Sequence, residues 1–84
     1  MNWEVVWRRS ARNDLATLWL DSSIRADITA AAHRIDFQLS RNPLGVGESR
    51  EEDRRILIEA PLAVIFKVKP ADRKVIVLRV WRIA

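Results

Sequence analysis

The sequence contains no cysteine and no tyrosine, and it has one histidine, two glycines and three prolines in 84 residues. Without cysteine, neither a disulfide nor a thiolate-ligated metal site can form, and one histidine leaves too few ligands for a structural zinc site. The absence of tyrosine also removes one common general base. We therefore expect a protein without a metal or other cofactor.

Long apolar runs are also missing. No stretch of 18 apolar residues occurs, so we expect no membrane span. Residues 1–7 lack the basic start and the long apolar segment of a signal peptide. These absences predict a cytoplasmic protein with no membrane partner.

The length predicts a single domain over residues 1–84, with a marginal core that association would help to stabilise. Acidic residues become scarce toward the C-terminus. Between Ala60 and Ala84 there are six Lys and Arg residues against one acid, Asp72. This basic segment indicates a polyanion or an acidic protein as partner, and the alternative is a soluble surface with excess arginine.

Two β-rich runs, Leu62–Val68 and Lys74–Trp81, organise what is present. Between them lies Lys69–Asp72, with Pro70 at the second position of a type I turn, so the pattern predicts an antiparallel hairpin. Both runs carry apolar residues on both faces. A strand of this kind is covered on both faces, and we expect one cover from the domain and one from a partner.

The other elements follow from periodicity and breakers. We expect a strand over Asn2–Arg8, a helix over Ala11–Leu20 with Ser10 as its N-cap and a helix over Ile24–Ser40 that ends before Pro43. A loop over Leu44–Ser49, a charged run over Arg50–Arg55 and a strand over Arg54–Glu59 follow. The expected order is β-α-α-β-β-β. We predict an α+β fold in which a helical hairpin packs on one face of an antiparallel sheet.

Familiar enzyme motifs do not fit the sequence. Gly45–Gly47 lacks the lysine and the preceding strand of a phosphate loop. His33 lies within the long helix, which favours a solvated or helix-packing side chain over a catalytic one. Glu51–Asp53 could bind a divalent cation, but the flanking arginines favour a self-neutralised, solvated loop.

Two groups of arginines remain. Arg50, Arg54 and Arg55 precede or open one strand, while Arg79 and Arg82 flank Trp81 at the end of another. If these strand ends converge, the guanidiniums would form an anion site beside an aromatic stacking surface. The alternative is that Trp81 belongs to the core and the arginines pair with nearby acids, Glu48, Glu51 and Glu59.

Several motifs together resemble one family. These are Trp3-x-Val5-x-Trp7, Ala11-x-x-Asp14-Leu15, Ile28-x-x-Ala31-x-x-x-Ile35-Asp36-x-x-Leu39, Asn42-Pro43, Gly47-Glu-Ser-Arg50, Arg55-x-Leu57, Pro61-Leu-x-Val-x-Phe-x-Val68 and Val75-x-Val-Leu-x-Val-Trp81. Their order and spacing resemble the RelE/ParE superfamily of type II toxin–antitoxin toxins. The resemblance implies a compact sheet with a helical hairpin. It also implies either mRNA cleavage in the ribosomal A site or inhibition of DNA gyrase, with neutralisation by a small antitoxin.

The resemblance implies site residues as well. Arg54 and Arg82, with Arg79 nearby, stand where the RNase branch carries catalytic basic residues, and the nucleic-acid contacts would come from Arg50, Arg55, Lys67 and Trp81. Ala63 stands where that branch places the arginine that contacts the scissile phosphate, and the C-terminal Tyr or His is missing. These departures favour a gyrase-directed toxin or an attenuated member that only binds its antitoxin.

A partner surface is predicted by strand alternation. The outer sheet face should carry an apolar set that is too large to remain bare: Ile56, Ile58, Ile65, Val77 and Trp81. We expect the antitoxin, or a second copy in a homodimer, to cover it. The expected partners are therefore a cognate antitoxin and either the ribosome with its mRNA or DNA gyrase.

Overall fold

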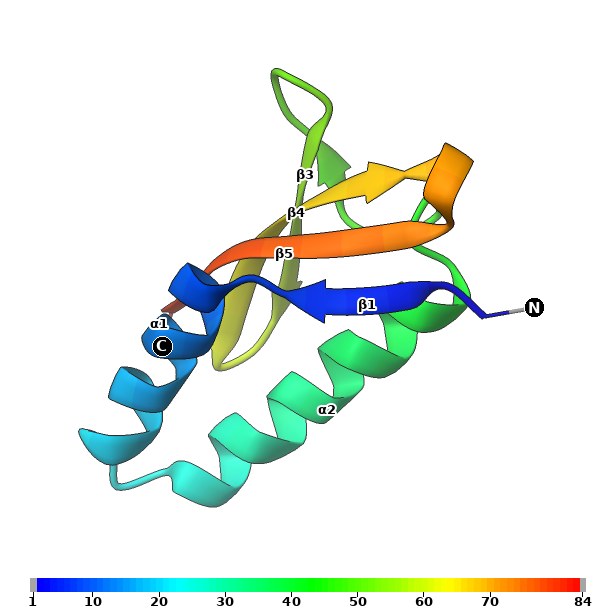
Figure 1. Ribbon diagram of the computed structural model, residues 1–84. Coiled ribbons are helices and arrows are strands. Elements are labelled where there is room, and N and C mark those ends of the chain that lie inside the picture. Colours follow the sequence, from blue (N-terminus) through cyan, green and yellow to red (C-terminus); the bar gives the residue numbers. More distant parts are fainter. Residues whose placement is uncertain (1, 84) are drawn as a thin grey trace.

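The computed structural model describes residues 2–83 and has two layers, a five-stranded sheet and a pair of helices on one of its faces (Figure 1). The elements in chain order are β1 (Glu4–Trp7), α1 (Arg9–Leu20), α2 (Arg25–Arg41), β2 (Glu48–Ser49), β3 (Arg54–Glu59), β4 (Leu62–Lys69), a 3-10 turn (Pro70–Asp72) and β5 (Lys74–Arg82). The strand order is β1-β5-β4-β3-β2. All neighbours are antiparallel except β1 and β5, which are parallel. The predicted α+β class and helical hairpin are confirmed.

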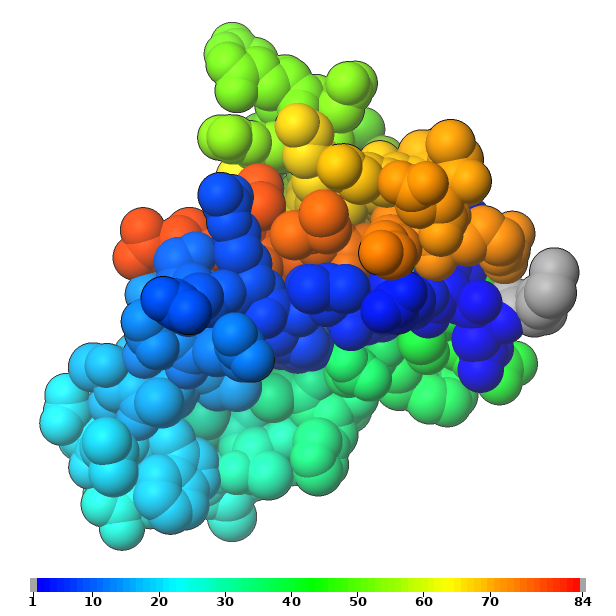
Figure 2. All heavy atoms as spheres, viewed as in Figure 1, coloured from blue at the N-terminus to red at the C-terminus, as the bar shows by residue number. Residues whose placement is uncertain are grey.

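The short strand β2 was not expected, because its two residues lie in the stretch predicted as a loop. Glu48 lies opposite Ile56, and Ser49 lies opposite Arg55. The connection from β2 to β3 projects from the body of the molecule (Figures 1 and 2). A two-residue strand carries too little alternation to be recognised in a sequence.

Ser10 is not the N-cap of α1, as the sequence predicted. The helix begins at Arg9, the cap position is Arg8, and no side chain caps the helix. The Ser10 hydroxyl instead donates a hydrogen bond of 2.8 Å to the Leu78 carbonyl of β5. The reason is that β1 ends at Trp7, so α1 satisfies backbone groups of β5 that β1 does not reach.

The hairpin of β4 and β5 forms as predicted, with a longer turn. Pro70–Asp72 makes one 3-10 turn, and Arg73 follows in the left-handed region at φ 48°. The Arg73 amide donates to the Pro70 carbonyl at 3.1 Å. The turn therefore includes Arg73, one residue beyond the predicted end at Asp72.

A β-bulge in this hairpin overturns one predicted surface residue. Ile65 lies opposite Arg79, but the next residue, Phe66, lies opposite Val77, so Leu78 has no partner of its own. The extra residue reverses the alternation of β5. Val77 is fully buried in the core and cannot belong to the outer sheet face, so its assignment to the partner surface was wrong.

The core lies between the helices and the sheet. The longer helix α2 contributes buried residues at helical spacing, Ile28, Ala31, Ala32, Ile35 and Leu39. The sheet contributes the other large group, which centres on Phe66 and includes Leu57, Leu62, Val64, Val75, Val77 and Val80. Within residues 2–83, no helix is long and apolar enough to cross a membrane.

Gly47 holds β2 against β3, and an alanine there should be costly. Its φ is +74°, and an added Cβ would lie 2.6 Å from the Ile56 carbonyl oxygen, which is backbone and cannot rotate away. We expect Gly47→Ala to lower the free energy of unfolding by about 2 kcal/mol, measured by urea denaturation. Gly45→Ala is the control, because the added methyl would meet only the movable Asn42 side chain. Equal losses would contradict this account of Gly47.

Candidate nucleic-acid interface

A basic hollow of about 460 Å³ lies where the β2–β3 connection meets β4. Four of its lining residues are cationic and one is acidic: Arg50, Arg54, Arg55, Lys67 and Asp53. The first four were all predicted as site residues from the sequence. We call this feature the basic hollow.

The three arginines of the basic hollow differ in how firmly they are held. Arg55 donates to the Val46 and Gly47 carbonyls and to the Ser49 hydroxyl, so it fixes the loop. Arg50 forms an exposed pair with Glu48 at 3.2 Å. Arg54 meets Glu52 at 3.8 Å, a long and exposed contact. Exposed pairs of this kind contribute little, so Arg50 and Arg54 can exchange their partners for an anion at small cost.

Arg54 and Lys67 are direct neighbours across the sheet. They occupy opposite positions in the β3–β4 register, and Lys67 is half-buried. Cβ atoms at such positions are about 5 Å apart, and like charges there destabilise the pair. A phosphate between the two side chains would relieve this repulsion and accept hydrogen bonds from both.

The backbone of the β2–β3 connection supports this arrangement. Glu52 and Asp53 both adopt left-handed conformations, at φ 60° and 61°. The turn closes through the Arg50 amide, which donates to the Arg54 carbonyl at 2.6 Å, and the Arg54 amide, which donates to the Glu51 carbonyl at 3.2 Å. The turn therefore keeps Arg50 and Arg54 at the two ends of one closed loop.

The second arginine group lies on β5, beside α1. Arg79 donates to both carboxylate oxygens of Asp14, at 2.7 and 2.9 Å, and the Val80 amide donates to Asp14 at 3.0 Å. The side-chain hydrogen bond from Arg79 is the main cause that lowers the pKa of Asp14, and it also raises the pKa of Arg79. Arg79 is thus already matched to a carboxylate within the chain.

The two arginine groups do not converge. Arg54 lies opposite Lys67, whereas Arg82 lies opposite Leu62 at the other end of β4. Five residues of strand separate these positions, a distance of about 16 Å at 3.3 Å per residue. Since β3 and β5 both run antiparallel to β4, the start of β3 and the end of β5 must lie at opposite ends of the sheet. Arg54, Arg79 and Arg82 therefore do not form one catalytic cluster.

The alternative predicted for Trp81 and the arginines holds in part. Trp81 is 38% exposed, so it is not a core residue. Arg50 does pair with Glu48, as that alternative expected. Glu59, however, binds two side chains of α2: Arg34 at 2.7 Å and Gln38 at 2.9 Å. Its pKa is lowered chiefly by the hydrogen bond from Arg34 and then by that from Gln38.

Between the two basic ends lies an apolar patch on the outer sheet face, which is the face away from the helices. Ile56 lies opposite Ile65, and Ile58 lies opposite Ala63, which in turn lies opposite Trp81. Ile58 is 63% exposed. Four of the five predicted partner-surface residues therefore share this patch, and we call the set Ile56, Ile58, Ile65 and Trp81 the sheet patch.

Ala63 lies under this patch, with only 1% of its surface exposed. Its cross-strand neighbours, Ile58 and Trp81, flank it on both sides. The position at which the RNase branch is expected to carry an arginine thus offers a buried methyl group. His33, the only histidine of the chain, lies on α2 and lines a groove between the two helices, away from the basic hollow.

Sequence reasoning missed the role of Asp14. The residue was part of a quoted motif, but its acceptance of bonds from Arg79 and Val80 joins residues more than 60 positions apart. No local pattern reveals such a pair. One signal was available, because Asp14 lies on the helix that directly follows the short strand β1. Since β1 runs parallel to β5 and is shorter, the helix must pass the part of the β5 edge that β1 leaves unpaired.

Acid should weaken the fold through Asp14 and Glu59, whose pKa values are both lowered in the folded state. Their contribution is complete above their unfolded pKa values of about 4 and is lost as the pH falls through the lowered folded values. We expect the urea midpoint to be flat above about pH 5 and to fall below it. Asp14→Asn combined with Glu59→Gln should flatten this profile; an unchanged acid slope would contradict the assignment.

Comparison with known proteins gives no sequence match: no protein-family model matches the chain, and neither does any curated protein. Solved structures do match. A chain of the toxin–antitoxin complex RelBE2 from Mycobacterium tuberculosis superposes with a TM-score of 0.81 and 24% identity, covering 98% of this chain and 92% of that one.

Two further structures extend the likeness. A chain of the chromosomal ParDE toxin–antitoxin system from P. aeruginosa has a TM-score of 0.79 and 20% identity, covering 98% of this chain and 97% of that one. A copper-bound mutant toxin from Helicobacter pylori has a TM-score of 0.58 and 15% identity, over 95% of this chain and 93% of that one. The chain therefore has a RelE/ParE-like fold over its whole described length, and the fold that the sequence resemblance implied is confirmed.

Proposed function

We propose that this chain is the toxin of a type II toxin–antitoxin module and that it arrests growth by binding DNA gyrase. The observation that carries the module assignment is the whole-length likeness to chains of the RelBE2 and ParDE systems. The likeness to a mutant toxin supports the toxin role over the antitoxin role. The sheet patch supports the assignment to a module with a partner protein, because a small chain that exposes Ile58 and Trp81 on one face needs a partner to cover that face.

The separation of the two arginine groups favours gyrase binding over RNA cleavage. Cleavage needs charge stabilisation and proton transfer at one phosphate, and removal of a general acid or base typically costs ~10²–10⁴-fold. Arg54 lies opposite Lys67 and Arg82 lies opposite Leu62, toward the two ends of β4, and Ala63 supplies no polar group between them. Inhibition by binding requires no such convergence.

The second candidate is ribosome-dependent mRNA cleavage. The specific observation in its favour is the Arg54–Lys67 pair, which could hold one phosphate of an RNA strand, with Arg50 beside it. The third is an inert member that only binds its antitoxin. Growth at the normal rate while folded protein accumulates would favour this last role.

Two assays on purified protein separate the candidates. We expect the protein to inhibit DNA supercoiling by purified gyrase and to leave transcripts intact on translating ribosomes. In cells, we expect a DNA-damage response that overproduction of gyrase relieves. Transcript cleavage at A-site codons with unimpaired supercoiling would replace gyrase by the second candidate. Arg54→Gln with Lys67→Gln should then abolish cleavage.

A further inference from the structure

The outer face of the sheet has a second pair of cations beside the basic hollow. Lys69 of β4 lies directly opposite Lys74 of β5, at the end of the hairpin next to its turn (Figure 1). Lys67, which lines the basic hollow, comes two residues before Lys69. Since Phe66 is buried in the core, strand alternation places Lys67 and Lys69 together on the outer face. We call Arg54, Lys67, Lys69 and Lys74 the cation track.

The lysines of the cation track are not engaged by carboxylates. They are the three lysines of the chain, and within residues 2–83 no hydrogen bond or ion pair involves their ammonium groups. Glu4 lies opposite Lys74 on β1 but forms no ion pair with it. Arg34 and Arg79, in contrast, each bind a carboxylate at 2.7 Å. Lys69 and Lys74 therefore face each other as like charges, and a bound anion would relieve their repulsion.

The spacing of the track fits a phosphate backbone. Arg54 with Lys67 forms one cross-strand pair, and Lys69 with Lys74 forms the next. Lys67 and Lys69 are about 7 Å apart at 3.3 Å per residue. This distance is comparable to the separation of consecutive phosphates along one DNA strand. Each pair can therefore neutralise one of two neighbouring phosphates.

The surroundings of the track favour a duplex over a single strand. Single strands are commonly held by exposed aromatic side chains that stack on their bases. On this face, within the described residues, the exposed aromatic side chain is that of Trp81. It lies opposite Ala63, which is four residues or about 13 Å along β4 from Lys67. The track itself offers only ammonium and guanidinium groups, which bind phosphate oxygens without reading the bases.

From these features we propose that the cation track binds the phosphate backbone of duplex DNA, so that the toxin engages gyrase while the enzyme holds its DNA. The inference rests on the proposed function, because that function places the chain beside gyrase-bound DNA. The track also adjoins the sheet patch, since Ile65 comes two residues before Lys67 on β4. One half of the outer face is thus apolar, and the other half is suited to a polyanion of any base sequence.

The first test measures binding of a fluorescently labelled DNA duplex of about two helical turns by anisotropy. Lys69→Gln combined with Lys74→Gln should raise Kd about tenfold at about 50 mM salt. It should also make the slope of log K against log salt concentration shallower by about one, because one phosphate contact is lost. Arg12→Gln combined with Arg41→Gln is the control, since both arginines are exposed and lie on the helices. It removes the same charge and should leave Kd within about twofold.

The second pair of the track supplies an independent measurement. Arg54→Gln combined with Lys67→Gln should also make the slope shallower by about one, and all four substitutions together should change it by about two. Both double variants should unfold at an unchanged or higher urea concentration, because each removes a repelling pair from the surface. If both bind the duplex with the affinity and slope of the unmodified chain, the track is not a DNA site, while inhibition of gyrase by the unmodified chain still supports the proposed function.

A supercoiling assay connects the track to gyrase. We expect about tenfold more of the Lys69→Gln, Lys74→Gln variant to be needed for half-inhibition. If duplex affinity falls but inhibition is unchanged, the DNA contact is not made in the gyrase complex, and the proposal is wrong on that point. If the unmodified chain binds duplex through the track but does not inhibit gyrase, the DNA site stands and the gyrase target fails.

Two competing probes test the identity of the ligand. Single-stranded RNA of the same length should bind more weakly than the duplex, and so should polyglutamate, because neither presents the spaced phosphates of a rigid backbone. Tighter binding of the RNA would replace DNA by RNA as the ligand. Tighter binding of polyglutamate would show that the track recognises an acidic protein instead.

Discussion

Replacement of Asp14 by alanine is expected to lower the free energy of unfolding by about 3 kcal/mol. Its carboxylate is 17% exposed and accepts three hydrogen bonds, two from Arg79 and one from the Val80 amide. Because Val80 lies beyond the end of β1, no strand can replace Asp14 as the acceptor for its amide. An unpaired buried amide costs about 1–3 kcal/mol, and loss of the charged pair adds to this.

Two matched variants separate these contributions. Asp14→Asn retains an oxygen for the Val80 amide but loses the paired charge, so we expect about half of the alanine effect. Arg79→Ala removes only the ion-pair partner of Asp14, whose side chain is 63% exposed, and should lower the free energy of unfolding much less. Urea denaturation at pH 7 measures all three. If Arg79→Ala lowers the free energy of unfolding as much as Asp14→Ala does, Asp14 stabilises the fold through its ion pair and not through the Val80 amide at the strand edge.

The second large effect is expected on partner binding. Ile58→Glu should weaken the complex with the antitoxin, the polypeptide encoded by the adjacent reading frame, by about 100-fold or more, because it places an uncompensated charge within the sheet patch. Ile58 is 63% exposed, so the fold itself should lose less than about 0.5 kcal/mol.

Ala71→Glu is the control for Ile58, since Ala71 is exposed in the turn before β5 and lies outside the patch. Calorimetry should find its affinity unchanged. If Ile58→Glu also binds normally, the sheet patch is not the antitoxin surface. Its apolar residues would then need another cover, and sedimentation of the isolated chain would show whether a second copy provides it.

The sequence predicted most of the fold because its elements are strongly patterned. The helix over Ile24–Ser40 was placed within one residue of α2 at each end, and the strand over Arg54–Glu59 coincides with β3. The apolar periodicity in these segments is continuous, and Pro43 stops the helix at a definite place. Local pattern and tertiary packing agree there, so local rules were sufficient.

The errors occurred where pairing between distant residues decides the structure. Val77 was assigned to the wrong face because Leu78 forms a bulge, which is visible only in the pairing of β5 with β4. The convergence of the two arginine groups, which the sequence left open as one alternative, does not occur, because the antiparallel order of β3, β4 and β5 separates them. This alternative could have been excluded from the sequence, because the predicted hairpins already determine which strand ends are neighbours.

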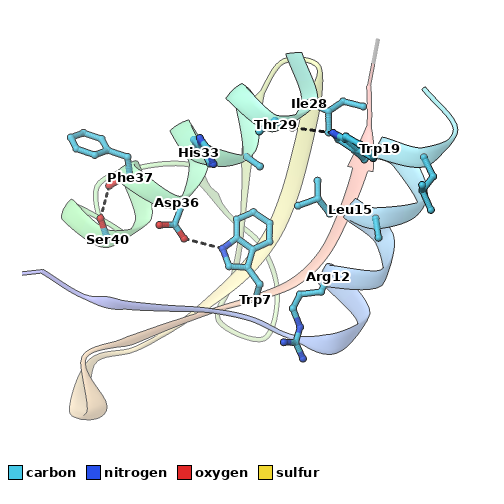
Figure 3. A pocket seen from close by; sticks show the side chains of 13 residues that line it. Trp7, Arg12, Leu15, Trp19, Ile28, Thr29, His33, Asp36, Phe37 and Ser40 are labelled. Atoms are coloured by element: carbon cyan, nitrogen blue, oxygen red, sulfur yellow. Dashed lines mark hydrogen bonds between the residues drawn. The ribbon is translucent and has the colours of Figure 1, made fainter. Parts of the chain in front are cut away.

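The groove between α1 and α2 (Figure 3) illustrates a further limit of reasoning from the sequence. Trp19 and Phe37 lie within the two predicted helices, but neither was assigned a role from the sequence. In the structure both line a groove, because α1 and α2 diverge from their short connection and β1 lies across the open end (Figure 1). Helical periodicity identifies an apolar stripe, but it does not reveal whether the chain itself covers that stripe.

Inducible expression in a bacterial host tests the central claim most directly, because the claim is that this fold is a growth-arresting toxin with a neutralising partner. We predict that induction stops growth and that co-expression of the adjacent reading frame restores it. Normal growth while soluble, folded protein accumulates would contradict the toxin assignment. Arrest that the adjacent frame does not relieve would contradict the proposed partnership.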